Sequence, residues 1–158
     1  MTARLIKTLK TDKIQSVRSR PPICVGKETL LSQVIGLMQD KKRGSAVVVE
    51  KEKLAGIFTE RDLLTRVLSK GLNLKKTAIG EVMTRSPDCL RNDSSIAEAI
   101  SLMSGKQHRH LPIVSADGAV AGMVSVRDIV DYLAEHFPYE VYNLPPDPHQ
   151  ISTAPEGA

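Results

Sequence analysis

The chain has 158 residues, of which 41% are hydrophobic and 25% charged, as in an ordinary globular protein. No apolar run approaches the roughly 18 residues of a membrane helix, and the N-terminus lacks the apolar core of a signal peptide. We therefore expect no membrane insertion and a cytoplasmic location. Cys24 and Cys89 are too few for a disulfide framework and show no metal-ligand spacing, which predicts reduced, buried thiols.

The net charge of +4 is concentrated at one end of the chain. Residues 1–20 hold six basic side chains and one acidic one, whereas the remaining 138 residues hold 16 basic and 17 acidic side chains. No basic surface with interleaved aromatic residues is evident, so nucleic acid is not expected as the main ligand. Binding of nucleic acid through the basic N-terminal segment, residues 1–18, is kept as a minor alternative.

One unit occurs twice in the chain. The segment Gly56–Asp62 has the same pattern as Gly122–Asp128: a glycine, two apolar residues, a hydroxyl residue and an aspartate three positions later. An offset of 65 residues also aligns Cys24 with Cys89, and one extra residue in the second hairpin loop raises the offset to 66. So many matches at one spacing indicate an internal duplication.

Each copy is predicted to fold as β-α-β-β-α, so the fold class is α/β (α+β). Apolar residues at helical spacing predict helices over 30–38 and 96–103, and short β-branched runs predict strands over 46–49 and 111–114. A unit of this size is marginal for a separate core, so the two should pack as one body. The predicted boundaries are 19–69 for the first unit, 83–137 for the second and 70–82 for the connector.

The tail, residues 138–158, is rich in proline and tyrosine. Five of the nine prolines lie beyond Phe137, which predicts neither helix nor sheet there. Four of the five aromatic residues fall between positions 132 and 142, so this stretch is expected to dock on the body or on a second subunit.

The sequence does not support catalysis. The nucleophile elbow, the Walker loop and the dinucleotide fingerprint are all missing. His108 and His110 could share one face of a strand, but no further ligand stands near them in sequence to complete a metal site. We therefore predict no enzyme, no catalytic residues and no metal.

The repeated segment offers two interpretations of equal weight. A helix N-terminus favours anions, and an aspartate in its first turn could accept both hydroxyls of a ribose. Basic pairs precede the neighbouring strands, so a nucleotide would satisfy all these groups together. The same spacing also forms a capping box, in which Thr59 with Asp62, or Ser125 with Asp128, only closes its own helix.

At this point the sequence resembles a known family. The repeated segment, Met83-Thr84 and the run from Arg109 to Val114 resemble a tandem pair of cystathionine-β-synthase-type (CBS) domains, the Bateman module of stand-alone CBS-pair proteins. The resemblance covers roughly residues 5–137. It implies pseudo-twofold packing of the two units, two clefts for adenosine derivatives (AMP, ADP, ATP or S-adenosylmethionine) and a homodimer.

The resemblance also implies which residues line the clefts. The unit 2 cleft would use Ser125, Arg127, Asp128, Arg109, His110, Pro22 and Ile23. The unit 1 cleft would use Thr59, Arg61, Asp62, Ser45, Thr84, Pro87 and Asp88. Because Ser45 replaces a basic residue in the unit 1 cleft, the unit 2 cleft is expected to bind nucleotide more tightly.

The function that we predict is a non-catalytic regulatory module. An adenosine nucleotide would be its regulatory ligand, with no cofactor required, and an enzyme or transporter its regulated partner. A ligand-independent interaction or dimerisation module, with vestigial clefts, is the main alternative.

Overall fold

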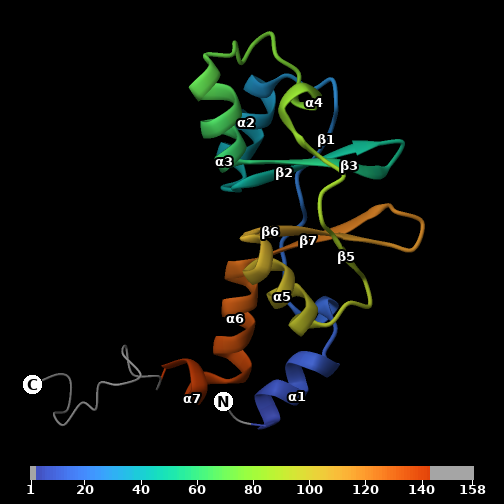
Figure 1. Ribbon diagram of the computed structural model, residues 1–158, viewed down its shortest axis with the longest axis vertical. Helices are drawn as coiled ribbons and strands as arrows, with labels where there is room; N and C mark the ends of the chain where they lie inside the picture. The colour runs from blue at the N-terminus through green and yellow to red at the C-terminus, as the bar shows by residue number, and fades with distance from the viewer. Residues whose placement is uncertain (1–2, 143–158) are drawn as a thin grey trace, which may run out of the picture.

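Two β-sheets face each other in the middle of the molecule, and helices cover their outer sides (Figure 1). The computed structural model describes residues 3–142. The first sheet has the order β1-β2-β3-β4 and the second β5-β6-β7. The strands are β1 (Cys24–Gly26), β2 (Ser45–Glu50), β3 (Lys53–Thr59), β4 (Thr84–Arg85), β5 (Leu90–Arg91), β6 (His110–Val114) and β7 (Val120–Ser125).

The helices follow the predicted order with several additions. The α-helices are α1 (Ala3–Thr11), α2 (Leu31–Asp40), α3 (Glu60–Asp62), α4 (Ile79–Val82), α5 (Ile96–Lys106), α6 (Val126–His136) and α7 (Pro138–Tyr142). A 3₁₀ turn, η1, covers Ile14–Ser16, and α3 continues into a π-helical turn, η2 (Leu63–Val67), and a 3₁₀ turn, η3 (Leu68–Lys70). The mixed α/β architecture built from two related units is therefore confirmed.

Strand pairing repeats between the two units. In each, the first strand runs parallel to the second, which forms an antiparallel hairpin with the third. The first hairpin shifts register between Val48 and Val49, and the second between Ile113 and Val114, which are the same positions at an offset of 65. The duplication thus preserves even the irregularities of the sheets.

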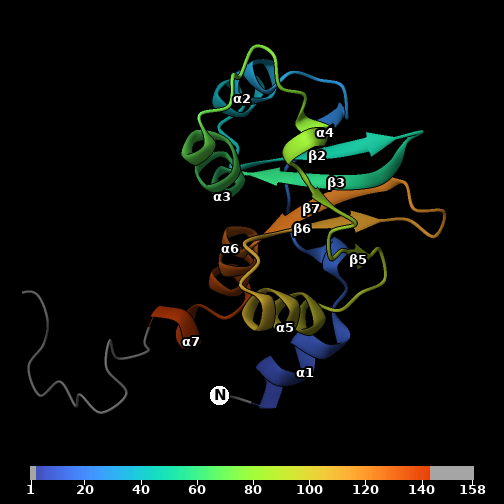
Figure 2. The same cartoon turned by 45° about the horizontal axis from the view of Figure 1, so that its top comes forward.

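The sheets meet through a small apolar layer. Val47 and Ile57 of the first sheet pack against Met123 of the second, and Figure 2 shows β3 beside β7 in the middle of the molecule. The Leu54 N–H donates to the Gly118 carbonyl oxygen (3.1 Å), which joins the two hairpins at one end.

Each repeat is completed by a segment that precedes the other repeat. Ile14 and Val17, before the first unit, lie in the core of the second. Ile79 and Val82, before the second unit, lie in the core of the first. The Ile14 N–H donates to the Ser94 carbonyl, and the Ile79 N–H to the Thr29 carbonyl, each at 2.8 Å. The two halves are therefore interlocked at both ends.

Two expectations from the sequence were wrong. The chain is helical beyond Phe137, because proline is tolerated at the first position of a helix, where Pro138 stands. Cys24 and Cys89 are exposed: both lie at the edge strands, and in β1 the alternation turns Val25 inward instead. The expected helix after Thr59 is present, but its hydrogen bonding changes from α to π and then to 3₁₀ along the segment.

The aromatic stretch docks only in part. Tyr132 and Phe137 are buried in the second core, but Tyr139 and Tyr142 are largely exposed. The prolines at 145, 146, 148 and 155 lie outside the described residues. Within residues 3–142 no helix is long and apolar enough to cross a membrane.

Candidate functional site

The repeated segment folds as a strand that enters a capped helix, in both copies. In the second copy, the Ser125 N–H and hydroxyl donate to Asp128 Oδ2 at 2.7 and 2.6 Å, and the Asp128 N–H donates back to Ser125 Oγ at 3.2 Å. In the first, Thr59 and Asp62 form the same bonds at 2.9, 2.9 and 3.3 Å. The capping interpretation is therefore confirmed, and it uses one oxygen of each carboxylate.

Loops from the neighbouring strand meet these helix starts. α2 is followed by Lys42, and α5 by Gln107, each in the left-handed region (φ 51° and 56°), which turns the chain toward the next strand. The Gly44 carbonyl then accepts the Glu60 N–H at 3.1 Å, and the Arg109 carbonyl accepts the Val126 N–H at 3.0 Å. Helix start and loop are thereby fixed side by side in each unit.

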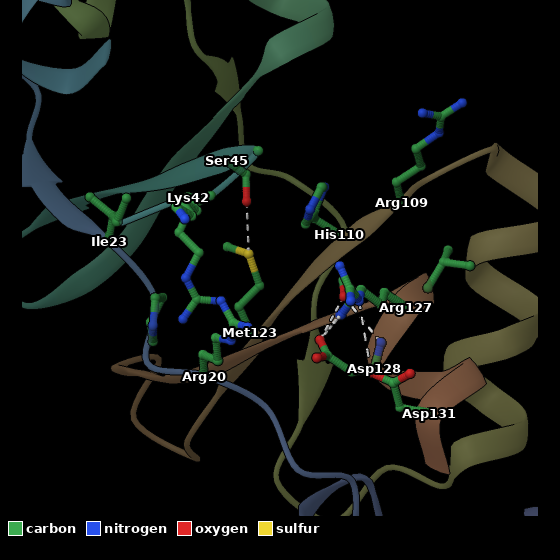
Figure 3. Close-up of a pocket in the computed structure, with 15 residues that line it drawn as sticks. Arg20, Ile23, Lys42, Ser45, Arg109, His110, Met123, Arg127, Asp128 and Asp131 are labelled. Carbon is green, nitrogen blue, oxygen red and sulfur yellow. Dashed lines mark hydrogen bonds and ion pairs between the residues drawn. The ribbon is translucent and has the colours of Figure 1, made fainter. Parts of the chain in front are cut away.

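Pocket 1 is a cavity of about 360 Å³ beside Asp128. Figure 3 shows that β2, β6, β7, the start of α6 and the segment before β1 contribute to its walls. Most of its ionisable side chains are basic: the lining includes Arg20, Lys42, Arg43, Arg109, His110 and Arg127, and only two acidic residues, Asp128 and Asp131. All seven residues predicted for the unit 2 cleft line it: Pro22, Ile23, Arg109, His110, Ser125, Arg127 and Asp128.

Pocket 2 is a larger cavity of about 640 Å³ beside Asp62. It is bordered by α3, η2, the segment around β4 and the loop before β6. Six of the seven residues predicted for the unit 1 cleft line it: Thr59, Arg61, Asp62, Thr84, Pro87 and Asp88.

The two pockets share one wall. Gly44, Arg109 and His110 line both of them. A Cβ atom on Gly44 would lie 3.3 Å from the Glu60 carboxylate and 3.4 Å from His110 Cε1, so the missing side chain allows these groups to approach. In Figure 3, His110 lies between Ser45 and Asp128, whereas the Arg109 side chain extends away from Asp128.

The sequence placed Ser45 in the wrong cleft. Ser45 lines pocket 1, where its hydroxyl donates to Met123 Sδ at 3.1 Å across the sheet interface. It is the first residue of β2 and 4% exposed, and its side chain is too short to reach pocket 2 as well, unlike the imidazole at the equivalent position, His110. Lys42 and Arg43, the basic pair that precedes β2, also line pocket 1.

Several charged residues of the pockets were missed by the sequence analysis. Arg20 enters pocket 1 from the segment assigned to the start of the first unit, and Asp131 lies one helical turn after Arg127. Arg66 and Lys106 line pocket 2. Arg66 stands four residues after Asp62, and this helical spacing could have identified it.

Electrostatics differ between the two pockets. In pocket 2, hydrogen bonds from Lys106 (2.8 Å) and His108 (2.8 Å) lower the pKa of Asp88. At the shared wall, burial lowers the pKa of His110. Near neutral pH, Asp88 is thus ionised and already paired, while the His110 ring is largely neutral.

The two aspartates differ in the contacts of their second carboxylate oxygen, Oδ1. Asp62 Oδ1 forms an ion pair with Arg66, whose Nε lies 3.3 Å away. Asp128 Oδ1 makes no hydrogen bond or ion pair to any residue in the described range 3–142. Over the same range, no cluster of His, Cys, Asp and Glu suits a metal ion.

Comparison with known proteins identifies the family. The CBS domain model matches the chain twice, over residues 14–69 and 79–135. The chain therefore belongs to the CBS domain family and contains a tandem pair of these domains. CBS domains are generally regulatory rather than catalytic.

Curated relatives share this region only. The meiotically up-regulated gene 70 protein of Schizosaccharomyces pombe is 33% identical over 124 residues, which is 72% of this chain and 17% of that protein. The chain spans about a fifth of the length of the curated relatives that it matches first.

Solved structures share the fold. A CBS-domain protein from Burkholderia ambifaria superposes with a TM-score of 0.68 and 27% identity, covering 94% of this chain and 97% of that one. CBS protein PAE2072 of Pyrobaculum aerophilum, complexed with AMP, has a TM-score of 0.70 at 20% identity over 84% of this chain and 100% of that one. The CBS domain pair of protein MJ0100, in complex with 5′-methylthioadenosine and S-adenosylmethionine, has a TM-score of 0.71 at 22% identity. The match covers 79% of this chain and 98% of that one.

Proposed function

We propose that the protein is a non-catalytic sensor of adenosine nucleotides, which bind in pockets 1 and 2. Asp128 in pocket 1, and Asp62 in pocket 2, would accept the ribose hydroxyls. In pocket 1, Pro22 and Ile23 would border the adenine. No cofactor is part of the proposal, and the nucleotide acts as a regulatory ligand.

One observation carries this proposal: Asp128 presents a carboxylate oxygen without a partner among residues 3–142, at the edge of a predominantly basic pocket. A ribose supplies two adjacent hydroxyl donors for such an acceptor, and a phosphate suits the basic side chains. The binding of AMP by a protein of the same fold is consistent with this assignment. A nucleotide that carries phosphate fits pocket 1 better than the cationic sulfonium of S-adenosylmethionine.

The test is calorimetric titration with AMP of the wild-type protein and of the Asp128→Asn variant. An asparagine keeps an oxygen for the helix cap but places an N–H₂ donor where the ribose needs an acceptor. We expect a loss of affinity of about tenfold or more in pocket 1. Asp131→Asn removes the same charge from the same pocket and should change the affinity little.

The opposite results would reject the proposal. If AMP, ADP, ATP and S-adenosylmethionine all fail to bind the wild-type protein at millimolar concentration, the alternative of a ligand-independent interaction module stands. If Asp128→Asn and Asp131→Asn lose affinity equally, the loss is not specific to Asp128 and the ribose contact at this residue is rejected.

A homodimer is part of the proposal. Leu64 and Leu68 on η2–η3 are 62% and 53% exposed, and Val126 and Val130 on α6 are 41% and 49% exposed. Both views show α3 and α6 on the same side of the molecule (Figures 1 and 2). Sedimentation velocity should show a dimer for the wild-type protein and a monomer for Leu64→Glu.

The regulated enzyme or transporter and the cytoplasmic location stay predictions from the sequence. Cross-linking in cell extract with and without AMP would test the first, and fluorescence imaging of a tagged chain the second. A nucleotide-dependent cross-linked partner is the expected outcome.

A further inference from the structure

Arg66 pairs with the carboxylate oxygen of Asp62 that the helix cap does not use, and both residues line pocket 2. Its Nε lies 3.3 Å from Asp62 Oδ1, while Oδ2 of the same carboxylate holds the Thr59 cap. Both oxygens of the carboxylate are thus engaged within the fold. Oδ2 already accepts two hydrogen bonds from Thr59, so a ribose diol, which donates two, needs both lone pairs of Oδ1 and would have to displace or loosen this ion pair.

Arg66 is held in place from its other side. Its Nη1 donates to the carbonyl oxygens of Val82 and Met83, each at 3.2 Å. The guanidinium therefore bridges Asp62 to the end of α4 and to Met83, which directly precedes Thr84 of pocket 2. Its side chain is 43% exposed and that of Asp62 10% exposed, so the contact is partly shielded from water.

The equivalent position in the second repeat behaves differently. At the offset of 66 residues, Arg66 corresponds to Tyr132, whose hydroxyl donates to Asp12 Oδ2 at 2.6 Å. Tyr132 is 3% exposed and turned toward the end of α1. It leaves Asp128 Oδ1 unpaired among residues 3–142, so one substitution between the repeats accounts for the difference between their aspartates.

We propose that Arg66 competes within the molecule for the carboxylate of Asp62, so that pocket 2 binds a nucleoside more weakly than pocket 1. This inference rests on the proposed function of the two pockets. The sequence predicted the same order because Ser45 replaces a basic residue, but Ser45 lines pocket 1 and cannot be the cause. With Arg66 as the competitor, pocket 1 fills first and pocket 2 responds at higher nucleotide concentration.

The decisive experiment removes the competitor while pocket 1 is disabled. Adenosine is titrated into Asp128→Asn and into Asp128→Asn with Arg66→Met. Adenosine carries no phosphate, so the loss of the arginine charge does not weaken an attraction to phosphate. We expect binding to tighten by about fivefold, the value of a partly exposed ion pair.

A second ligand separates competition from a general change of the pocket. 2′-Deoxyadenosine lacks one of the two hydroxyls, so Arg66→Met should tighten its binding much less than that of adenosine. In the Asp62→Asn background, pocket 1 is the pocket that keeps its aspartate. There, adding Arg66→Met should leave the affinity for adenosine unchanged. Arg66→Gln serves as the second variant, since its amide can still donate to the Val82 and Met83 carbonyls if the methionine variant folds poorly.

The possible outcomes distinguish the two proposals. If Arg66→Met and Arg66→Gln leave adenosine binding in pocket 2 unchanged or weaken it, Arg66 is not a competitor, although pocket 1 still binds nucleotide. A gain that is equal for adenosine and 2′-deoxyadenosine also overturns the inference. If the wild-type protein binds neither adenosine nor AMP in either pocket, the proposed function fails together with it.

Discussion

A single aspartate in each repeat can serve the fold and a ligand together. The capping and ligand interpretations of Asp128 looked like alternatives in the sequence, but a carboxylate has two oxygens. Oδ2 closes the helix through Ser125, and Oδ1 has no partner among residues 3–142. The cap also fixes the direction in which Oδ1 points, so the structural role prepares the proposed ribose contact.

His110 links the two pockets electrostatically. Burial lowers the pKa of His110 from its ordinary 6.5. The carboxylates of Glu60 and Asp128 act to raise it, and the guanidinium groups of Arg109 and Arg43 lower it further. The ring is therefore mostly neutral at pH 7, and at this pH it takes up a proton when an anion such as a phosphate binds beside it.

We predict that AMP binding in pocket 1 strengthens as the pH falls from 8 to 6.5. A bound phosphate favours the charged imidazolium, so binding takes up a proton and lower pH promotes it. The gain cannot exceed about tenfold per pH unit, because one proton is involved. Calorimetry across this range would measure it, above the pH at which the phosphate itself is half protonated, about 6.

Two comparisons check the origin of this pH dependence. His110→Gln should abolish it, whereas His108→Gln, which changes a half-buried histidine of pocket 2, should retain it. Adenosine, which has no phosphate, should bind equally at both pH values. A pH dependence that survives in His110→Gln would assign the proton to another group.

At the level of elements, the two glycines that open the repeated segment have different surroundings. A Cβ on Gly56 would lie 2.4 Å from Met83 Sδ and 2.9 Å from the Thr84 carbonyl oxygen, because the chain that enters β4 pairs with β3 there. A Cβ on Gly122 would first meet Ile113 Cδ1, at 3.6 Å. Within residues 3–142 only the first sheet has a fourth strand, which explains the asymmetry.

Gly56→Ala should therefore destabilise the protein by about 1–3 kcal/mol, since backbone and sulfur must shift to admit the methyl group. Gly122→Ala should change the free energy of unfolding by no more than about 0.5 kcal/mol. Urea unfolding of the two variants would measure this contrast. Equal destabilisation would mean that strand propensity, which alanine changes alike at both sites, matters more than the close contact of Gly56 with Met83 and Thr84.

The elements that the sequence predicted are those with a strong local pattern. The β-branched runs of β2 and β6 and the apolar stripe of α5 needed no tertiary information, and Ser95 caps α5. α4 was missed because it lies in the short lysine-rich connector, which has no periodicity, and β4 because it is only two residues long, Thr84–Arg85. Their structure comes from packing on the first repeat.

In the candidate site, too, the sequence predicted the residues with a local pattern and missed those placed by tertiary structure. The residues of the repeated segment could be placed beside the pockets from the sequence, because the local pattern alone shows that they stand where a strand ends and a helix begins. The location of Ser45 depends on how the two sheets face each other, which local sequence does not encode. Tertiary contacts likewise decide that Tyr132 turns to Asp12, whereas the approach of Arg66 to Asp62 follows from their spacing of four residues.

For the whole molecule, the exchanged segments bind the two repeats into one cooperative unit. Ile14 is 1% exposed in the core of the second repeat, and Ile79 is fully buried in the core of the first. Each comes from the stretch that precedes the opposite repeat, so neither repeat has a complete core from its own residues alone. A change at either position must therefore be felt by both halves.

We predict that Ile14→Ala and Ile79→Ala each lower the free energy of unfolding by about 2–5 kcal/mol, the usual cost of such a cavity in a core. Each variant should still unfold in one transition, with coincident loss of helical signal and tertiary packing. Ile6→Ala, at a site 42% exposed, is the matched control and should change stability little. Two separated transitions in the Ile14→Ala variant would show instead that the second repeat unfolds alone, and that the exchanged segments do not couple the two nucleotide pockets through a common folding unit.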